Sequence, residues 1–322
     1  MIAAKYKVIV VTPVYEDLEA CSRLFKELKA QYQKTVFVVA VDDGSVKHPL
    51  QIDSLKDANI DGAVLKLKRN VGHQKAIAIG LGYVSDKLNS KQVIVVMDSD
   101  GEDLPSTIPN LLSELKNSEI DVVVAHRKNR IETVKFKLFY EVYKQFFKLL
   151  AGRSISFGNF MALKSHAVER LVSMQELSIH LAGAVLASKL RIKTCSLDRG
   201  PRYAGQSKMN FVGLVLHGFK ALMVFAEDVL VRVGIACVVI AGISVSAALT
   251  AIILKIFGFA TPGWFSIVLG ILILMLMQMG AVALMTLMLT GVIRSGSVTS
   301  LISYHDFIRE VILSDEENNF ER

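Results

Sequence analysis

The hydrophobic pattern divides the chain into two parts of different character. Over the first half, short runs rich in β-branched residues alternate with longer amphipathic stretches. The short runs predict strands at Lys7–Thr12, Thr35–Val41, Ala63–Leu67, Gln92–Met97 and Ile120–Ala125. Apolar residues at helical spacing predict helices at Leu18–Gln31, Gln74–Lys87 and Ser106–Lys116. Because strands that alternate with helices form open, mostly parallel sheets with helices on both faces, the predicted fold class is α/β.

Two long uncharged runs follow in the C-terminal part. Neither Val233–Leu254 nor Trp264–Ile293 contains a charged residue. A helix needs about 20 residues to cross a hydrocarbon core of about 30 Å, so each run is long enough. The link Lys255–Gly263 contains one proline and two glycines, which end a helix. The sequence therefore predicts a transmembrane hairpin, with helices at 229–257 and 264–293 and a tail at 294–322.

The residues just before the hairpin have a third pattern. Between Asn210 and Glu227, polar or small residues recur at spacings of three and four along one stripe, and large apolar residues fill the rest. This pattern predicts an amphipathic helix at 210–228 that lies in the membrane interface. The alternative is an ordinary helix packed on the soluble domain. That domain is predicted to occupy residues 1–209.

The charges around the hairpin predict its orientation. Lysines and arginines flank the hairpin on both sides, whereas the link offers only Lys255. By the positive-inside rule, the soluble domain and both termini lie in the cytoplasm of a cell with the hairpin in its inner membrane. Val8–Val11 is too short for the core of a signal peptide, which agrees with this expectation. Small residues such as Ala241, Ser244 and Ala248 form a close-packing face, so a homo-oligomer held by these helices is a further expectation.

Charge and cysteine content narrow the function classes. The net charge of +7 suits an anionic lipid surface or a phosphorylated substrate. The chain has no long lysine or arginine tract and no nucleic-acid motif, so a nucleic-acid partner is not expected. Its three cysteines lack metal-ligand spacing and cannot all pair, which fits a reducing compartment.

Polar clusters follow the predicted strands at Thr12–Glu16, Asp42–Ser45 and Asp98–Asp103. Ligands of open α/β sheets bind at the carboxyl ends of the strands, where these clusters lie. Asp98 and Asp100 lie two residues apart, so both side chains can face one divalent cation from an extended segment. Mg²⁺ and Mn²⁺ prefer oxygen ligands and leave positions for substrate phosphates.

Two further segments are candidates for ligand contacts. Asp42 or Asp43 can hydrogen-bond a nucleobase or a ribose hydroxyl, although Asp-Gly-Ser is also ordinary turn chemistry. The segment Arg69–Lys75 joins a strand to a helix, where free N–H groups favour a phosphate or sugar oxygen. Its side chains His73 and Lys75 are equally compatible with a solvated surface.

Five elements resemble those of a known family in type and order: Val11–Glu16, Asp42–Ser45, Arg69–Gly72, Asp98–Asp100 and Arg202–Lys208. They resemble glycosyltransferase family 2, and the last one looks like the Arg-x-x-Gly-x-Ser-Lys element of its polyprenyl-phosphate branch. That branch includes dolichyl-phosphate mannose synthases and bacterial undecaprenyl-phosphate glucosyltransferases with a C-terminal membrane hairpin. The resemblance covers nearly the whole chain, through about Ile293.

The resemblance implies a GT-A fold, a Rossmann-like mixed α/β domain, for residues 1–209. It implies that Mg²⁺ or Mn²⁺ is bound by Asp98, Asp100 and Glu102, the last standing where the family usually has glutamine. It implies that phosphate is bound by Arg202, Ser207 and Lys208. The predicted catalytic residues are therefore Asp98, Asp100, Arg202 and Lys208. Together with the clusters above, the predicted nucleotide-sugar contacts are Thr12, Pro13, Tyr15, Glu16, Asp42, Asp43, Asn70, His73, Lys75, Asp98 and Ser99.

One stretch departs from the family pattern. Where the family often has Asp-x-Gly-Asp-Phe-Arg-Leu, this chain has Ser156–Ala162, without the two carboxylates and the arginine. No catalytic base can be carried over to this stretch, and Asn159 is its candidate sugar contact. A base is not required, because the second pKa of a phosphomonoester is about 6 and the acceptor is already largely anionic at neutral pH.

The function expected from this resemblance is membrane-bound, inverting transfer of a sugar from a nucleotide diphosphate donor to polyprenyl phosphate. UDP-glucose is the expected donor and a cell-surface glycan the expected destination. A processive polysaccharide synthase is disfavoured because its Gln-x-x-Arg-Trp element is absent, the one tryptophan being Trp264. The alternative from another class is a catalytically inactive relative that acts as a membrane scaffold or regulator, which the altered stretch slightly favours.

Overall fold

The computed structural model describes residues 2–127, 134–203, 211–259, 263–296 and 303–314. The chain divides into two compact units. Unit 1 comprises Met1–Leu138, Ile155–Val224 and Leu301–Arg322, and unit 2 comprises Phe139–Ser154 and Phe225–Ser300. Unit 1 thus contains most of the predicted soluble domain at 1–209, whereas Phe139–Ser154 of that domain groups with the predicted hairpin in unit 2.

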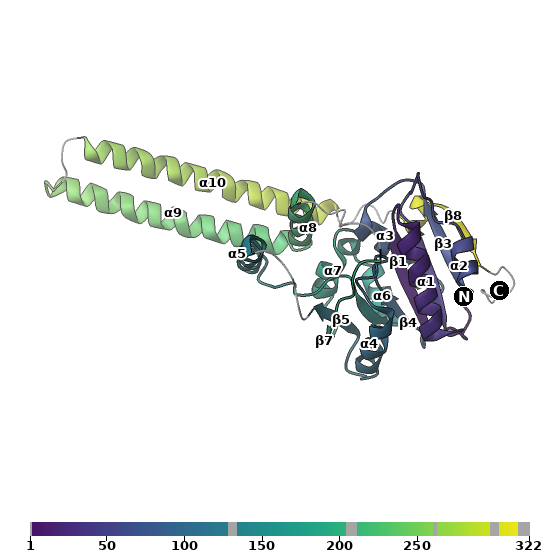
Figure 1. The fold of residues 1–322 in the computed structure, drawn as a ribbon. Coiled ribbons are helices and arrows are strands. Elements are labelled where there is room, and N and C mark those ends of the chain that lie inside the picture. The colour runs from purple at the N-terminus through teal and green to yellow at the C-terminus, as the bar shows by residue number, and fades with distance from the viewer. Residues whose placement is uncertain (1, 128–133, 204–210, 260–262, 297–302, 315–322) are drawn as a thin grey trace. The chain divides into compact units, whose positions relative to one another are not determined.

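Unit 1 contains an eight-stranded sheet (Figure 1). Its strands are β1 (Val8–Val14), β2 (Val36–Asp42), β3 (Gly62–Leu67), β4 (Val93–Val96), β5 (Val122–Arg127), β6 (Met161–Lys164), β7 (Ile192–Leu197) and β8 (Ile308–Leu313). They lie in the order β7-β5-β6-β4-β1-β2-β3-β8. Strands β4, β1, β2 and β3 are parallel, whereas β6 and β8 run antiparallel to their neighbours. The sheet is therefore mixed, which confirms the predicted α/β class.

The strand order reverses beside β1. The chain passes from β1 to β2 and β3 on one side and then places β4 on the other side of β1. The register sets Val14 opposite Asp42 and Val11 opposite Val96, so three strands end at the same edge. Ligands of open α/β sheets bind outside the carboxyl ends of the strands at such a switch point.

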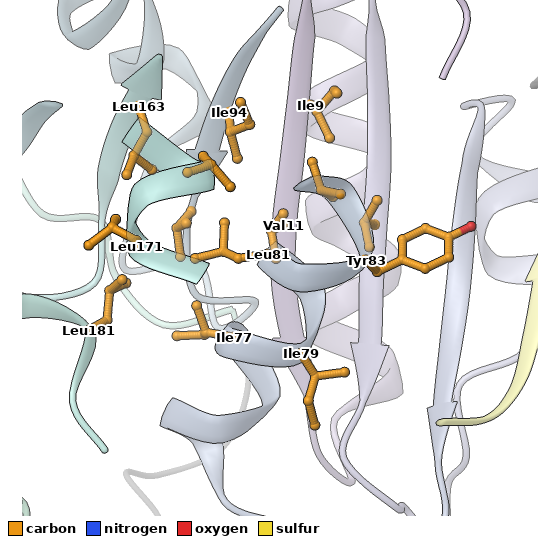
Figure 2. Packing of buried hydrophobic residues seen from close by; sticks show 14 of the residues in the cluster. Ile9, Val11, Ile77, Ile79, Leu81, Tyr83, Ile94, Leu163, Leu171 and Leu181 are labelled. Atoms are coloured by element: carbon orange, nitrogen blue, oxygen red, sulfur yellow. The ribbon is translucent and has the colours of Figure 1, made fainter. Parts of the chain in front are cut away.

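Helices cover both faces of this sheet. The helices that lie within unit 1 are α1 (Leu18–Tyr32), α2 (Asp53–Asp57), α3 (His73–Ser85), α4 (Ile108–Leu115), α6 (Ser165–Val172), α7 (Leu181–Ala187) and α8 (Phe211–Met223), with 3₁₀ turns η1 (Pro105–Thr107), η2 (Gln175–Ser178) and η3 (Tyr304–Phe307). Successive side chains of a strand point to opposite faces. Accordingly Ile9 and Val11 join the core against α3, shown around Leu81 in Figure 2, whereas Val8 and Val10 join the core against α1 and α4.

Unit 2 consists of a helical hairpin and part of α5 (Val134–Ala151). Helices α9 (Ala226–Ile256) and α10 (Trp264–Gly296) lie side by side (Figure 1). Both are long and apolar enough to cross a membrane, and the mean hydropathy of the most apolar part of each is 2.5. Only 17% of that part of α9 and 0% of that part of α10 is buried, whereas the core helix of a soluble protein is mostly buried.

The structure differs from the sequence-based expectation at several elements. Strands β6, β7 and β8 were not predicted, and β8 forms within the residues assigned to a tail at 294–322. The reason is pairing: β8 is added to the edge of β3, a partner that local sequence does not reveal. The helix predicted at 210–228 ends at Met223, and α9 begins three residues later, at Ala226. Helix α8 belongs to unit 1, and its place at a membrane interface stays a prediction.

Candidate active site

The carboxyl ends of β1, β2 and β4 form one edge. The backbone N–H of Asp43 donates to the carbonyl of Val14 over 2.8 Å, and the N–H of Met97 donates to the carbonyl of Val11 over 3.2 Å. Thr12 lies in this edge and is fully buried, and its hydroxyl has no hydrogen-bond partner among the described residues. A buried polar group without a partner costs free energy, so it marks a candidate functional position.

The carboxylates of Asp42 and Asp43 hold the loops of this edge together. Asp42 accepts hydrogen bonds from the N–H groups of Ser45 and Leu50, both over 2.9 Å. Asp43 accepts hydrogen bonds from the N–H of Val71 over 2.7 Å and from the N–H of Gly72 over 3.0 Å. Burial raises the pKa of Asp43, against these hydrogen bonds. The turn chemistry left open by the sequence is therefore present, and direct contact of these carboxylates with a nucleoside stays a prediction.

Glu16 has a similar structural role. Its carboxylate accepts from three consecutive N–H groups, those of Val46, Lys47 and His48, over 2.6, 2.9 and 2.8 Å. These hydrogen bonds lower the pKa of Glu16. The backbone at Glu16 has φ 49°, a left-handed conformation that is uncommon outside glycine. Glu16 thus fixes the loop that follows β2, and the neighbouring Tyr15 remains 44% exposed at the edge.

Asp98 and Asp100 lie in a loop that is fixed by its own hydrogen bonds. The N–H of Asp98 donates to Oδ2 of Asp103 over 3.1 Å, and the N–H of Glu102 donates to Oδ1 of Asp100 over 3.0 Å. Between them, Gly101 has φ +88° and packs against the ring of Tyr203, so a side chain there would overlap this ring. The two carboxylates therefore have defined positions at the end of β4.

Two arginines of the segment after β7 pair with this acidic loop. The guanidinium of Arg202 lies 2.7 Å from Oδ2 of Asp100 and 3.3 Å from Oε1 of Glu102. Arg199 pairs with the other oxygen of Glu102. The backbone reinforces the contact, because the N–H of Tyr203 donates to the carbonyl of Asp100 over 2.9 Å. The acidic loop and the segment after β7 thus form one charged cluster.

This cluster limits how a metal can be bound. Within the described ranges, no group of three or more histidine, cysteine, aspartate or glutamate side chains is arranged to hold a metal ion. Glu102 is engaged by two arginines, which it would have to release to complete the predicted three-ligand set. A Mg²⁺ site needs only one or two carboxylates when substrate phosphates complete it. Asp98 and Asp100 fit that smaller set by their chemistry, and the role of Glu102 as a ligand stays a prediction.

A chain of side-chain amides connects α7 with Asp98. Gln74 is buried and accepts from the N–H of Leu181 over 2.7 Å. Its amide therefore donates to Oδ1 of Asn159, over 3.0 Å, which leaves Nδ2 of Asn159 at 2.9 Å from Nε2 of His73. The same ring nitrogen lies 3.1 Å from Oδ1 of Asp98. The structure thus brings His73 and Asn159, two predicted nucleotide-sugar contacts, near Asp98, together with Gln74, which the sequence did not single out and which orients Asn159.

One nitrogen of His73 faces two partners. A neutral imidazole with its proton on Nδ1 accepts at Nε2 from Asn159, whereas an imidazolium donates there to Asp98. Burial of His73 opposes the charged form, but the carboxylates of Asp98, Asp100 and Asp43 outweigh it and raise the pKa of this histidine. The protonation state of His73 therefore selects between Asn159 and Asp98.

The other predicted site residues are less closely connected. The ammonium of Lys75 lies 4.0 Å from the ring centroid of Phe307, in the C-terminal segment. Asn70 is exposed, and Ser99 is buried at 8% exposure beside the two aspartates. Pro13 pairs with β2 inside the ladder. The predicted phosphate ligands Ser207 and Lys208 lie outside the described residues.

The residues that the sequence did not single out are those whose partners are distant in the chain. Arg199 pairs with Glu102, and Gln74 reaches Asn159 across 85 positions. A weak signal existed for Arg199, since it lies three positions before Arg202 in a segment rich in glycine and proline. No local pattern distinguishes Gln74 from the other polar residues of its helix.

Comparisons with known proteins place the chain among glycosyltransferases. The family model for glycosyl transferase family 2 matches residues 9–167. An uncharacterized glycosyltransferase of Bacillus subtilis, YkoT, is 26% identical over 267 residues, which is 81% of this chain and 75% of the relative. Undecaprenyl-phosphate 4-deoxy-4-formamido-L-arabinose transferase of Enterobacter sp. is 26% identical over 223 residues, 66% of each chain.

A solved structure is similar as well. Glucosyl-3-phosphoglycerate synthase from Mycobacterium tuberculosis, crystallised with Mn²⁺ and UDP-glucose, superposes with a TM-score of 0.48 at 12% identity, over 70% of this chain and 80% of that chain. The mixed sheet of unit 1 has the GT-A arrangement that the family match implies. Residues 9–167 are therefore a glycosyltransferase family 2 domain, and the chain resembles the polyprenyl-phosphate branch of that family.

Proposed function

We propose that this protein is a membrane-bound, inverting glycosyltransferase that moves a sugar from a nucleotide diphosphate donor to polyprenyl phosphate. One observation carries the proposal: the family 2 domain places Asp98 and Asp100 at its switch point, with Arg202 2.7 Å from Asp100, in a chain that also has two long apolar helices. The named similarity to an undecaprenyl-phosphate transferase supports the acceptor class.

The donor diphosphate is held by this charged cluster. Arginine suits bidentate contacts to phosphate oxygens. Arg199 and Arg202 follow β7 and pair with the acidic loop that follows β4 at the switch point. A phosphate group that replaces a carboxylate as the partner of Arg202 keeps the guanidinium paired. Mg²⁺ or Mn²⁺, when bound by Asp98 and Asp100, neutralises charge on the leaving diphosphate. Positioning and charge neutralisation by these residues are the main sources of rate.

The acceptor supplies its own nucleophile. A phosphomonoester has a second pKa of about 6, so its oxygen is anionic at neutral pH and needs no side-chain base. This oxygen attacks the anomeric carbon from the face opposite the leaving group. The new bond to the phosphate oxygen forms as the bond to the nucleoside diphosphate breaks, and the configuration of the sugar inverts. The amide of Asn159, in place of a carboxylate, agrees with this base-free reaction.

The hairpin brings the lipid acceptor to the site. Helices α9 and α10 cross the inner membrane, and α8 lies at its surface, where Leu216, Phe219 and Met223 form an exposed apolar side. Unit 1 includes residues on both sides of the hairpin, so both ends of the hairpin face the compartment of the domain. The positive-inside rule assigns that compartment to the cytoplasm. UDP-glucose as donor and undecaprenyl phosphate as acceptor follow from the resemblance to the bacterial branch.

The direct test is transfer of radiolabelled sugar from a panel of UDP- and GDP-sugars to undecaprenyl phosphate in detergent, with Mg²⁺, Mn²⁺ or EDTA. A charged glycolipid product is expected with one donor. The Asp100→Ala variant should lose activity about 100-fold or more, as expected for a group that organises the transition state. The matched control is Asp57→Ala, which removes an exposed carboxylate of α2. The proposal fails if a folded, membrane-inserted protein yields no product with any donor.

One observation favours the alternative of a catalytically inactive scaffold. The arginines already neutralise Asp100 and Glu102 within the protein. An inactive relative would give no product with any donor and no metal-dependent binding of a nucleotide sugar. Binding of a nucleotide sugar measured by calorimetry, with and without Mn²⁺, therefore separates the two functions.

A further inference from the structure

The rings of His180 and His217 fix the positions of each other's protons. Nδ1 of His180 accepts from the N–H of Gly183 over 3.1 Å, so the proton of the neutral ring lies on Nε2. That nitrogen lies 3.1 Å from Nε2 of His217, which therefore accepts the hydrogen bond. Burial lowers the pKa of both histidines, which keeps both rings neutral at neutral pH. The proton of His217 consequently lies on Nδ1.

The Nδ1–H group of His217 is a donor without a protein acceptor. Within the part of the chain that the structure describes, the ring of His217 makes one hydrogen bond, the one with His180. The residue is half-buried in unit 1, and its ring is held by its partner rather than free to turn in water. A half-buried donor that the protein leaves unpaired is a candidate contact for a ligand.

His217 lies beside the candidate active site. Burial is the main cause of its lowered pKa, the charge of His73 adds to this effect, and the charge of Asp98 opposes it, so both groups lie near this ring. The first turn of α7 connects the two histidines. The N–H of Leu181 donates to Gln74 over 2.7 Å, at the start of the amide chain that leads to His73. The residue before Leu181 holds His217, so one turn of helix positions both rings.

Apolar and polar side chains follow one another in a defined order around α8. Leu216, Phe219 and Met223 are 56%, 56% and 60% exposed and form one apolar side. With about 3.6 residues per turn, Lys220 lies beside this apolar side, and His217 lies next to Lys220, toward α7. Lys220 is exposed, its charge also lowers the pKa of His217, and it forms no ion pair with the described residues. An unpaired cation thus separates a directed donor from an apolar surface.

This order of surfaces matches a ligand that carries a phosphate on an apolar chain. A phosphate oxygen can accept from the Nδ1–H of His217, and the ammonium of Lys220 supplies the opposite charge. Hydrogen bonds to an ionised acceptor are about twice as strong as those between neutral groups. The apolar chain of the same ligand can lie along Leu216, Phe219 and Met223. A nucleoside diphosphate has no such chain, so the pair suits the lipid acceptor better than the sugar donor.

We propose that His217 and Lys220 bind the phosphate of the polyprenyl acceptor, and that His180 is a positioning residue that keeps the proton of His217 on Nδ1. The inference rests on the proposed function and deepens it. It adds α8 to the predicted phosphate ligands Ser207 and Lys208, which precede this helix in the sequence. The proton stays on His217 throughout, so the ring holds the attacking phosphate in place and does not act as a base.

The test measures binding of farnesyl phosphate to the full chain in neutral detergent by calorimetry, with farnesol and lysophosphatidylglycerol as comparison ligands. His217→Gln keeps an acceptor at the position of Nε2, facing His180, but has no donor at the position of Nδ1. His217→Asn has an amide at the position of Nδ1 and is the matched control. His217→Gln should bind farnesyl phosphate about tenfold or more weakly, whereas His217→Asn should bind it nearly as tightly as the native protein.

Two further measurements extend this test. In the transfer assay, His217→Gln should raise the KM for undecaprenyl phosphate and leave the KM for the nucleotide sugar unchanged. Lys220→Gln should also weaken binding of farnesyl phosphate, and the remaining affinity should depend less on salt, because one of the attracting charges is removed. Binding of farnesol, which lacks the phosphate, should be the same in the native protein and all three variants.

The role of His180 has a readout of its own. Nuclear magnetic resonance of isotope-labelled histidine shows which ring nitrogen carries the proton. In the native protein the proton of His217 is expected on Nδ1. In His180→Asn the shorter side chain no longer reaches His217, so part of the proton population should move to Nε2 and the KM for undecaprenyl phosphate should rise. An unchanged proton position in His180→Asn would overturn the positioning role.

The other outcomes separate this inference from the proposed function. Equal affinity of the native protein and His217→Gln for farnesyl phosphate, or equal losses in His217→Gln and His217→Asn, would overturn the inference alone. A raised KM for the nucleotide sugar would assign the pair to the donor and overturn it as well. An equal loss of lysophosphatidylglycerol binding would assign the pair to membrane phospholipids, with the same consequence. A native protein that neither binds farnesyl phosphate nor forms a glycolipid would overturn the proposed function itself.

Discussion

At the residue scale, the carboxylates of the site have two different roles. Glu16, Asp42 and Asp43 accept hydrogen bonds from backbone N–H groups and hold three loops in place. Asp98 and Asp100 also pair with the side chains of His73 and Arg202, which can move, although Asp100 in addition accepts from the backbone N–H of Glu102. Carboxylates that accept only from backbone N–H groups keep fixed positions. Carboxylates that pair with charged side chains can exchange those partners when a charged ligand binds. The second pair is therefore where chemistry is expected.

A buried histidine pair makes the domain sensitive to acid. Nδ1 of His180 accepts from the N–H of Gly183 over 3.1 Å, which caps α7 and places the proton of the ring on Nε2. That nitrogen lies 3.1 Å from Nε2 of His217 in α8. Burial, with a contribution from His217, lowers the pKa of His180 to about 3. Protonation of either ring would place two N–H donors opposite each other, with no acceptor between them.

The sign of the pH dependence follows from this shift. In the unfolded chain a histidine has a pKa of about 6.5. Below that pH the unfolded state binds a proton at His180, whereas the folded state, with its lowered pKa, does not. Stability is then expected to fall by about 1.4 kcal/mol per pH unit between about pH 6 and pH 4. His180→Asn keeps a capping oxygen and removes the titrating group, so the melting temperature in detergent should vary less over this range. The exposed His48→Asn is the control and should keep the full pH dependence.

Much of the candidate site was accessible from sequence at this scale. Asp98, Asp100 and Arg202 were identified because strand-end carboxylates and the Arg-x-x-Gly-x-Ser-Lys pattern are local signals. Gln74 and Arg199 were not, because their roles depend on partners that only the fold brings near. Glu102 pairs with two arginines because the segment after β7 contacts the loop after β4. No local sequence pattern indicates this contact.

At the scale of elements, α3 sets the geometry of the site. It begins at His73, directly after the turn held by Asp43, and crosses the sheet beneath the switch point. At Gly80 the helix approaches the sheet closely, since a β-carbon there would lie 2.7 Å from a methyl of Val11 and 2.9 Å from a methyl of Val41. Interiors packed this closely transmit small displacements to their neighbours.

The substitution Gly80→Ala tests this approach. The added methyl overlaps two β-branched side chains of central strands, so the domain should lose about 1–3 kcal/mol of stability despite the better helix propensity of alanine. Thermal unfolding in detergent measures the change. Gly270→Ala in α10 is the control, because a β-carbon there meets no atom within 4 Å. Equal melting temperatures for the two variants would contradict the close packing of α3.

The elements themselves were predicted where the sequence has a strong local period. The five strands from β1 to β5 lie within two residues of their predicted bounds, because continuous β-branched runs are typical of buried parallel strands. The missed strands lack that signal. Strand β6 has only four residues, and β7 alternates with polar, mostly exposed side chains. Strand β8 has a clear apolar content but was assigned to the tail because its partner lies far away in sequence.

At the scale of the whole molecule, the chain leaves unit 1 for the hairpin and then returns to it. After α10, β8 pairs antiparallel with β3, and Tyr304, Phe307, Ile308 and Leu313 pack against the core of the sheet. The C-terminal segment is therefore a structural part of unit 1, although it lies outside residues 9–167 that the family model matches.

Deletion of residues 303–322 should destabilise the domain. The loss of four partly buried apolar side chains costs on the order of 1 kcal/mol each, and the edge of β3 is left without a partner. Limited proteolysis and thermal unfolding in detergent should both show a weaker domain, while α9 and α10 still insert into the membrane. Deletion of residues 315–322 leaves β8 in place and serves as the control. An unchanged melting point after the longer deletion would contradict a structural role for β8.

The late position of β8 has a consequence for how the protein is made. The N–H of Gly62 donates to the hydroxyl of Ser314 across 252 positions, so β3 emerges from the ribosome long before its partner exists. Both hydrophobic helices are synthesised in between, and if they cross the membrane as proposed above, they meet the insertion machinery before β8 exists. Until then the sheet keeps an open edge at β3, which proteases and chaperones can recognise. On that proposal, β8 completes the sheet only after the hairpin has been synthesised, so the edge of β3 stays open until the last part of the chain is made.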